Sequence, residues 1–271
     1  MTSIISNTDL KICIFECEQC QKCPLCKTRT NIVFGAGNPF SRVMFIGEAP
    51  GKNEDEQGVP FVGAAGNLLN ELLEGIDYTR NDIYIANILK CRPPRNRDPK
   101  LGEVEACTPW LLEQIKCIKP KVLVTLGNFA THFVLNADKG VGISKLRGVV
   151  YTVNENDEES LFDVAWQIEK EQKTNRTVQF SFFKGGKSLM SDSDANTLTE
   201  TPVFSITKVL SKDAQLKPDS RLNVTINPQI ISAAGADVQV LPMFHPASAI
   251  YKRSNIAALK DDFAQLKEIL I

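Results

Sequence analysis

The sequence lacks several features that would place it in a common functional class. No apolar run approaches the roughly 18 residues that a membrane-spanning helix needs, so we expect no membrane span. No GxxxxGK[ST] motif occurs, which excludes a phosphate-cradling NTPase of the P-loop type. The formal net charge is only −1, which argues against a generally basic nucleic-acid binder, although a local basic groove is compatible with that average.

Cysteine and histidine are unevenly distributed. All eight cysteines lie before residue 118, five of them within fourteen residues, and the two histidines are His132 and His245. The N-terminus has neither a basic start nor a clear small-residue cleavage site, so we expect no signal peptide. Without an export signal, the crowded cysteines indicate a metal site rather than a disulfide framework. The same cysteine usage predicts a cytoplasmic protein of a bacterium or archaeon.

Short apolar runs alternate with helical patterns in the first half of the chain. Residues 43–46, 83–89 and 121–126 have the length and composition of buried strands. Residues 101–118 and a stretch that begins at Gly127 have helical patterns. Strands that alternate with helices imply a mostly parallel sheet with helices on both faces. The sequence therefore predicts an α/β fold, a three-layer α/β/α sandwich around a short, mostly parallel central sheet.

The segment 152–237 differs in composition from its surroundings. It is rich in charged and small polar residues and has neither cysteine nor histidine. Extended runs at about 148–153 and 238–244 flank it, and we expect them to pair as a hairpin. We therefore predict one domain formed by residues 1–151 and 238–271, with 152–237 as an insertion at the hairpin tip, partly folded and partly mobile.

Two cysteine pairs are candidate metal ligands. Cys20 and Cys23 form a CxxC pair, and Cys91 and Cys107 form a wider pair. Four thiolates can hold tetrahedral zinc or an iron–sulfur cluster. A zinc ribbon places its pairs about 15–20 residues apart, whereas 67 residues separate Cys23 from Cys91. This spacing favours a cluster that staples the N-terminus to the core. The alternative, a buried free cysteine, is our interpretation of Cys117. Three further cysteines leave the first pair open to a three-residue shift: Cys13, Cys17 and Cys26.

Polar residues near strand ends form a second candidate site. In an open α/β sheet, ligands bind beyond the carboxyl ends of the strands, and Glu48, Asn87 and His245 lie near such ends. A neutral imidazole can donate to developing negative charge, and a rigid carboxamide can read a pyrimidine edge. Phe61, in a loop, is either a core anchor or a platform on which a base stacks. The structural alternatives are a solvated acidic face for Glu48, a sheet-end amide for Asn87 and a packing histidine for His245.

Taken together, these motifs resemble the family 4 uracil-DNA glycosylases, the iron–sulfur members of that superfamily. The resemblance runs from about residue 20 to 152 and from 238 to about 253. It implies a monofunctional enzyme that flips uracil out of DNA, hydrolyses its N-glycosidic bond and leaves an abasic site in base excision repair. The motifs that carry it are GEAPG (47–51) with Glu54 and Asp55, PFVG (60–63), NILKCRPP (87–94) and HPA (245–247).

The resemblance also implies roles for single residues. Phe61 would stack on the uracil ring, Asn87 would bond its O4 and N3, and His245 would stabilise negative charge at O2. Glu48 would position water and offset the cationic sugar, and Glu54 would guard the position of a thymine methyl group.

The remaining implied roles concern the base, the DNA and the cofactor. Gly47 and Ala49 would help to hold the base. A 4Fe–4S cluster, structural and near the DNA, would be held by Cys20, Cys23, Cys91 and Cys107. A loop that wedges into the duplex would include three DNA-contacting residues: Ser248, Lys252 and Arg253.

Two rival functions remain. A non-catalytic cysteine-cluster module that binds nucleic acid is one, but mere binding does not need Glu48, Asn87 and His245 together. A glycosylase that accepts a broader range of deaminated bases is the other. A glutamate at position 48 argues against the family 5 type. We expect a monomer acting on nucleoid DNA, and a protein partner for 152–237 is conceivable.

Overall fold

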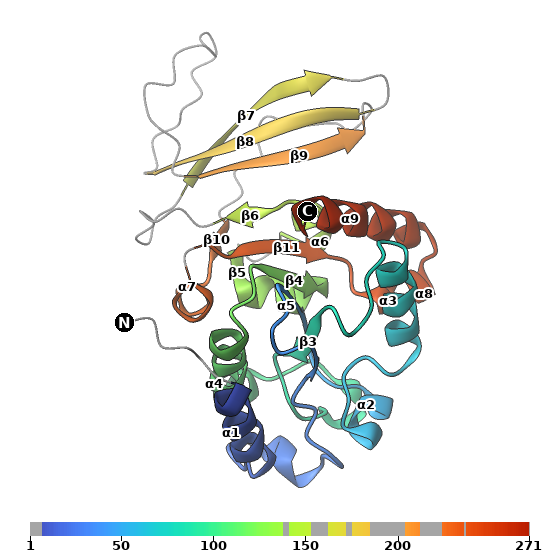
Figure 1. Cartoon of the computed structure of the whole chain (residues 1–271), viewed down its shortest axis with the longest axis vertical. Helices are drawn as coiled ribbons and strands as arrows, with labels where there is room; N and C mark the ends of the chain where they lie inside the picture. Colours follow the sequence, from blue (N-terminus) through green and yellow to red (C-terminus); the bar gives the residue numbers. More distant parts are fainter. Residues whose placement is uncertain are drawn as a thin grey trace.

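The computed structural model describes residues 7–137, 141–152, 162–171, 175–184, 204–211, 224–235 and 237–270. A central sheet lies between two layers of helices (Figure 1). The predicted three-layer α/β/α sandwich is confirmed. The predicted partial mobility of 152–237 concerns a segment of which about half lies outside the described part of the chain. Within that part, no helix is long and apolar enough to cross a membrane.

The central sheet has six strands, and its inner four are parallel. The edge strands β1 and β6 run antiparallel to their neighbours. Because parallel strands end at the same edge, the chain segments that follow the inner strands meet there. In spatial order the strands are β1 (Ala36–Gly37), β3 (Tyr84–Asn87), β2 (Val43–Gly47), β4 (Val122–Leu126), β11 (Gln239–Met243) and β6 (Tyr151–Thr152).

Strand β2 shows why the sequence forms a buried strand between two cores. Val43 and Phe45 face one apolar cluster, and Met44 and Ile46 face the other, because successive side chains point to opposite sides of a sheet. All four are at most 1% exposed. Burying each such side chain contributes about 1.5–3 kcal/mol, so an unbroken apolar run is stable only between two helical layers.

The helices divide between the two faces of the sheet (Figure 1). One layer consists of α3 (Ala64–Glu74), α8 (Pro246–Tyr251) and α9 (Ser254–Leu270). The other consists of α1 (Asn7–Glu18), α4 (Leu101–Ile118), α5 (Gly127–Val134), α6 (Ile143–Leu146) and α7 (Pro228–Ala234). The short elements between them are η1 (Pro24–Lys27), α2 (Lys52–Gln57) and η2 (Pro94–Asn96).

Helix α2 was not expected from its acidic sequence, yet it forms directly after the β2 turn. Gly58 ends it in the left-handed conformation (φ 72°), and its N–H donates to the Glu54 carbonyl at 2.8 Å. Asp55, 3% exposed, accepts a hydrogen bond from the Thr30 backbone at 2.9 Å. These contacts fix α2 beside the cysteine-rich segment.

The expected hairpin around residues 152–237 is present, because Gln239 pairs with Thr152 and Val240 with Tyr151. Within the segment, β7 (Phe162–Glu171), β8 (Asn175–Lys184) and β9 (Phe204–Ser211) form an antiparallel sheet. Strand β10 (Val224–Ile226) pairs instead with β5 (Leu135–Ala137). Together with Ile230 of α7, the buried ends of β10 join the apolar cluster of the main fold. The division of the chain at 152 and 237 stays a prediction.

Candidate functional site

The floor of the site is the junction between the ends of β2 and β3. Gly47 and Asn87 are partners in the parallel ladder. A methyl group on Gly47 would lie 2.3 Å from Asn87 Oδ1 and 3.0 Å from Cε2 of Phe61. Only glycine therefore lets these two side chains approach the strand. Beyond the strands, Ile88 and Leu89 donate backbone hydrogen bonds to the carbonyls of Gly47 and Glu48, both at 3.0 Å.

A cleft with an empty volume of about 720 Å³ opens above this floor. It lies where the inner strands end, as the fold class predicts. The sequence-predicted residues that line it are Glu48, Ala49, Glu54, Phe61, Asn87 and His245. The structure therefore brings six of the seven proposed catalytic and base-binding residues to one cleft, with Gly47 directly against two of them.

The Asn87 side chain is buried but has no hydrogen-bond partner among the residues that the structure describes. Asn87 is 2% exposed, and the one hydrogen bond that a side chain makes to it goes, in the described structure, to its backbone carbonyl, from Lys90 Nζ at 2.7 Å. Buried amides in proteins are almost always hydrogen-bonded. The Asn87 carboxamide therefore offers a donor and an acceptor to a molecule in the cleft.

His245 is held as a hydrogen-bond donor. It precedes α8, and its Nδ1 accepts a hydrogen bond from the Ala247 backbone at 3.1 Å. Burial lowers the pKa of His245 from 6.5 to about 4, and the Glu54 carboxylate opposes this only in part. At neutral pH the ring is uncharged, and because Nδ1 accepts, its proton is on Nε2.

Glu48 follows Gly47 and is half-buried at the cleft. Burial raises the pKa of this carboxyl above its usual value, and the nearby carboxylate of Asp98 raises it further. A carboxylate that is poorly hydrated interacts strongly with positive charge that develops beside it.

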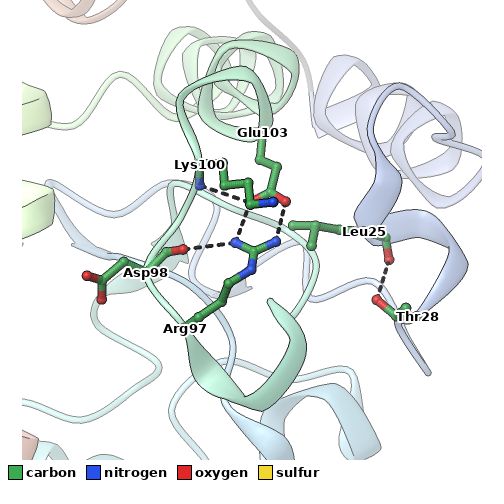
Figure 2. A network of polar contacts seen from close by, with 6 residues as sticks. All are labelled: Leu25, Thr28, Arg97, Asp98, Lys100 and Glu103. Carbon is green, nitrogen blue, oxygen red and sulfur yellow. Dashed lines mark hydrogen bonds and ion pairs between the residues drawn. The ribbon is translucent and has the colours of Figure 1, made fainter.

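The far wall of the cleft is the loop between β3 and α4. Pro93, Asn96 and Arg97 line the cleft from this loop. Figure 2 shows the Arg97 guanidinium forked onto the Glu103 carboxylate, with contacts of 2.9 and 2.5 Å and a further bond to the Asp98 carbonyl. Glu103 also accepts from the Lys100 backbone at 2.9 Å (Figure 2). The loop is thus fastened to the first turn of α4.

The cysteine cluster lies behind that loop. One pocket is lined by all four predicted ligands: Cys20, Cys23, Cys91 and Cys107. Cys17 and Cys26 line it as well, so the alternative first pair remains open. All eight cysteines are free thiols. Among the described residues, no group of three or more metal-binding side chains is close enough to hold a metal ion, so the ligand set stays a prediction.

Hydrogen-bond donors surround the predicted ligands. Trp110 Nε1 donates to Cys20 Sγ at 3.4 Å, Arg29 Nη1 to Cys91 Sγ at 3.4 Å, and the Lys90 backbone to Cys107 Sγ at 3.2 Å. Hydrogen bonds to sulfur stabilise thiolates and tune iron–sulfur clusters. The chemistry of this donor set fits the group that the resemblance implies.

Comparison with known proteins decides the family. The family model described as the uracil DNA glycosylase superfamily matches residues 34–270. The chain belongs to that superfamily. It is 51% identical to the type-4 uracil-DNA glycosylase of Archaeoglobus fulgidus over 140 residues. The aligned stretch covers 51% of this chain and 70% of the relative. The type-4 enzyme of Thermotoga maritima is 50% identical over 131 residues, 48% of this chain and 68% of the relative.

A third type-4 uracil-DNA glycosylase, from Saccharolobus solfataricus, is 49% identical over 142 residues, 51% of this chain and 66% of the relative. The resemblance to family 4 uracil-DNA glycosylases is confirmed.

In this member of the superfamily, the predicted DNA-contacting residues follow His245 and Ala247, which line the cleft. Ser248 was expected in a loop, but it lies in α8, because His245 caps that helix and Pro246 begins it. Lys252 ends α8, and its N–H donates to the Ser248 carbonyl at 2.9 Å. Lys252 and Arg253 are exposed. Their contact with DNA stays a prediction.

Sequence reasoning missed three residues of the glycosylase site: Arg80, Lys90 and Arg97. Lys90 is 1% exposed and bonds Gln114 Oε1 as well as the Asn87 carbonyl. Arg80 bonds backbone carbonyls of the loop that carries Phe61. Neither position has a local sequence signal, because an isolated basic residue is usually solvated. Only the fold brings these side chains to the backbone of residues at the cleft.

Proposed function

We propose that this chain is a monofunctional uracil-DNA glycosylase that hydrolyses the N-glycosidic bond of uracil in DNA and leaves an abasic site for base excision repair. Its relatives are named type-4 uracil-DNA glycosylases. The observation that carries the proposal is the buried Asn87 carboxamide, which has no partner among the described residues and lies at the floor of a cleft also lined by Glu48, Phe61 and His245. A module that only binds DNA has no use for this convergence.

Uracil would be recognised after it is flipped from the helix, since the bond to be broken is inaccessible in the stack. Phe61 stacks on its ring. The Asn87 amide donates to O4, and its carbonyl accepts from the N3 hydrogen. Cytosine presents the opposite pattern, a donor at position 4 and an acceptor at N3, so it leaves both groups of Asn87 unpaired. Such a mismatch in a buried site costs about 1–3 kcal/mol per group.

Bond cleavage develops negative charge on uracil and positive charge on the sugar. His245 Nε2 donates to O2 of the departing uracil, and a donor of this kind stabilises a transition state by about 3–4 kcal/mol. The Glu48 carboxylate offsets the oxocarbenium-like sugar and orients the water that adds to C1′. The water's proton passes to the Glu48 carboxylate or to solvent. The electron pair of the broken N-glycosidic bond goes to N1 of uracil.

Other residues would hold the base or the DNA. Gly47 and Ala49 let the backbone approach the base, and Glu54 excludes the thymine methyl group. Three residues of the segment that follows His245 would contact the duplex: Ser248, Lys252 and Arg253. The active species would be a monomer on nucleoid DNA in a prokaryotic cytoplasm, and residues 152–237 could engage a protein partner.

A 4Fe–4S cluster is the proposed cofactor, with Cys20, Cys23, Cys91 and Cys107 as ligands. It would supply a covalent link between the N-terminal segment and the β3–α4 loop, with no electron transfer in the reaction. Because Cys91 lies in that loop and the residues that follow it line the cleft, the cluster would act on activity through the loop's position.

The test is incubation of purified protein with an end-labelled oligonucleotide that contains one uracil, followed by alkali, beside an absorption scan at about 400 nm, where iron–sulfur proteins absorb. Cleavage at uracil by brown protein supports the enzyme and the cluster. Cleavage by colourless protein supports the enzyme and contradicts the cluster. Folded, brown protein that leaves the strand intact favours the DNA-binding module.

A further inference from the structure

The loop that carries Phe61 is gripped by two side chains of opposite charge. Arg80 Nη1 donates to the Pro60 carbonyl at 3.0 Å, and Arg80 Nη2 donates to the Phe61 carbonyl. Oε1 of Glu54 accepts from the backbone N–H groups of Val62 and Gly63, at 3.0 and 3.1 Å. A cation therefore satisfies two successive carbonyls, and an anion satisfies the next two N–H groups.

This grip holds an unfavourable backbone conformation. Phe61 has φ +55°, in the left-handed region, although it is not a glycine. That region costs a residue with a side chain about 1–2 kcal/mol, and such conformations persist only where the surroundings over-determine them. Arg80 donates two hydrogen bonds to this loop and Glu54 accepts two from it. Together they hold Phe61 in this conformation, because charged groups form the stronger hydrogen bonds.

Helix α3 supplies both the space and the anchor for Arg80. A methyl group on Gly66 would lie 1.8 Å from the Phe61 carbonyl oxygen, so that carbonyl occupies room that only glycine leaves. Arg80 Nε donates to Asn70 Oδ1 of α3 at 2.7 Å, which orients the guanidinium. Helix α3 thus fixes the positions of both the Phe61 carbonyl and its donor, Arg80.

The backbone of Phe61 determines where its ring lies. The ring packs against the His245 imidazole, with centroids 5.4 Å apart and planes 26° from parallel, and it lies next to Gly47. A return to an ordinary φ, between about −60° and −160°, would swing the ring out of this position. The base-stacking face and the leaving-group donor would then no longer be held together.

We propose that Arg80 and Glu54 are positioning residues that fix the Phe61 ring against His245 and so preform the base pocket. This proposal rests on the proposed function, because it assigns the two side chains a part in the same reaction. It also gives Glu54 a task other than steric exclusion of thymine, since its Oε1 is committed to the loop.

A double-mutant cycle tests whether Arg80 acts through Phe61. Arg80→Lys keeps the charge but loses the fork, and it should lower kcat/KM on uracil DNA by about 10- to 100-fold. In a Phe61→Ala background, the same substitution should change kcat/KM by less than about twofold, because the ring that Arg80 positions is gone. An equal loss in both backgrounds would overturn the proposal. Arg42→Lys, at an exposed arginine beside β2, is the matched control.

A second measurement is independent of activity. NMR of labelled protein should show nuclear Overhauser contacts between the Phe61 and His245 rings in the wild type, in Arg42→Lys and in Glu54→Gln, which keeps a carbonyl acceptor. Arg80→Lys and Glu54→Ala should lose these contacts. If Arg80→Lys fails to fold, the milder variant Asn70→Ala takes its place, and it should weaken the contacts. If the contacts survive in every folded variant, the positioning role of Arg80 and Glu54 is overturned. If the wild type is inactive on uracil DNA, only the proposed function is overturned.

Discussion

The Phe61 ring lies against the His245 imidazole, with the ring centroids 5.4 Å apart. The two residues lie far apart in the sequence: Phe61 is in the loop after α2, and His245 follows the end of β11. They meet because β2 and β11 both run parallel to β4 and end at the same edge of the sheet. The proposed pocket is therefore complete only when the chain on both sides of residues 152–237 has folded together.

Gly47→Ala should abolish most uracil cleavage. The added methyl would lie 2.3 Å from Asn87 Oδ1 and 3.0 Å from the Phe61 ring, so one of the two must move. A displacement of this size at a reacting site can reduce the rate about 100-fold, while overpacking costs about 1–3 kcal/mol of stability. Single-turnover cleavage and thermal unfolding of the same sample separate the two effects.

The control for that substitution is Gly102→Ala. Gly102 lies near the start of α4, and a methyl group there meets nothing within 4 Å. Activity should be unchanged. Equal activity of the two alanine variants would contradict the packing that we describe around Gly47.

His245→Ala should lower the cleavage rate about 100- to 1,000-fold, the usual effect of losing one donor to a developing anion. Because burial lowers the pKa of His245 to about 4, the ring is neutral throughout the range in which an ordinary histidine titrates. The wild-type rate should therefore show no change in slope near 6.5, the ordinary histidine pKa. His132→Ala, in α5, removes the only other histidine and should leave cleavage intact. If the cleavage rate of this variant still changed with pH near 6.5, a neutral His245 donor would be contradicted.

Glu48 should set the acid limb of the pH–rate profile. Its active form is the carboxylate, and burial, aided by Asp98, raises its pKa. Activity should therefore fall, as pH decreases, at a higher pH than an ordinary glutamate would give. Asp98→Asn removes the smaller cause, so the limb should move to lower pH, less so in high salt, which screens the exposed Asp98. A limb that moves upward would show that another group titrates.

The cysteine assignment makes a graded prediction. Serine at Cys20, Cys23, Cys91 or Cys107 should bleach the visible absorption and lower the bound iron. Serine at Cys26, which lines the same pocket, or at Cys117 should preserve both. A colourless Cys26 variant beside a brown Cys20 or Cys23 variant would show that the first ligand pair is shifted along the chain. Absorption and iron content, measured on purified protein, need no activity assay.

Much of the fold could be predicted because its inner strands are short, largely apolar and buried on both faces. Residues 43–46 and 122–124 are unbroken apolar runs, and such runs are stable only between two helical layers. Helix α4 was predicted with its observed bounds, Leu101–Ile118. Helices α2 and α8 were not, because α2 depends on Gly58 at its C-terminus and α8 on the His245 side chain at its N-terminus rather than on an apolar face.

The cleft residues could be predicted only because motifs marked them. Glu48, Asn87 and His245 each stand near a strand end, a position that topology assigns to ligands. Arg80 and Lys90 could not be found in this way, since Arg80 bonds backbone carbonyls of a distant loop and Lys90 bonds the side chain of Gln114 in α4. Such contacts depend on loop geometry, and sequence patterns carry little information about it.

The measurement that tests the central claim most directly compares wild type and Asn87→Ala on one duplex that contains a single uracil. Single-turnover cleavage and DNA affinity are measured on the same samples. Asn87 is a buried side chain whose polar atoms have no protein partner in the described structure, so its loss should slow cleavage at least about 100-fold through lost orientation. DNA affinity should stay nearly unchanged. A parallel loss of affinity and rate, or an unchanged rate, would contradict the account.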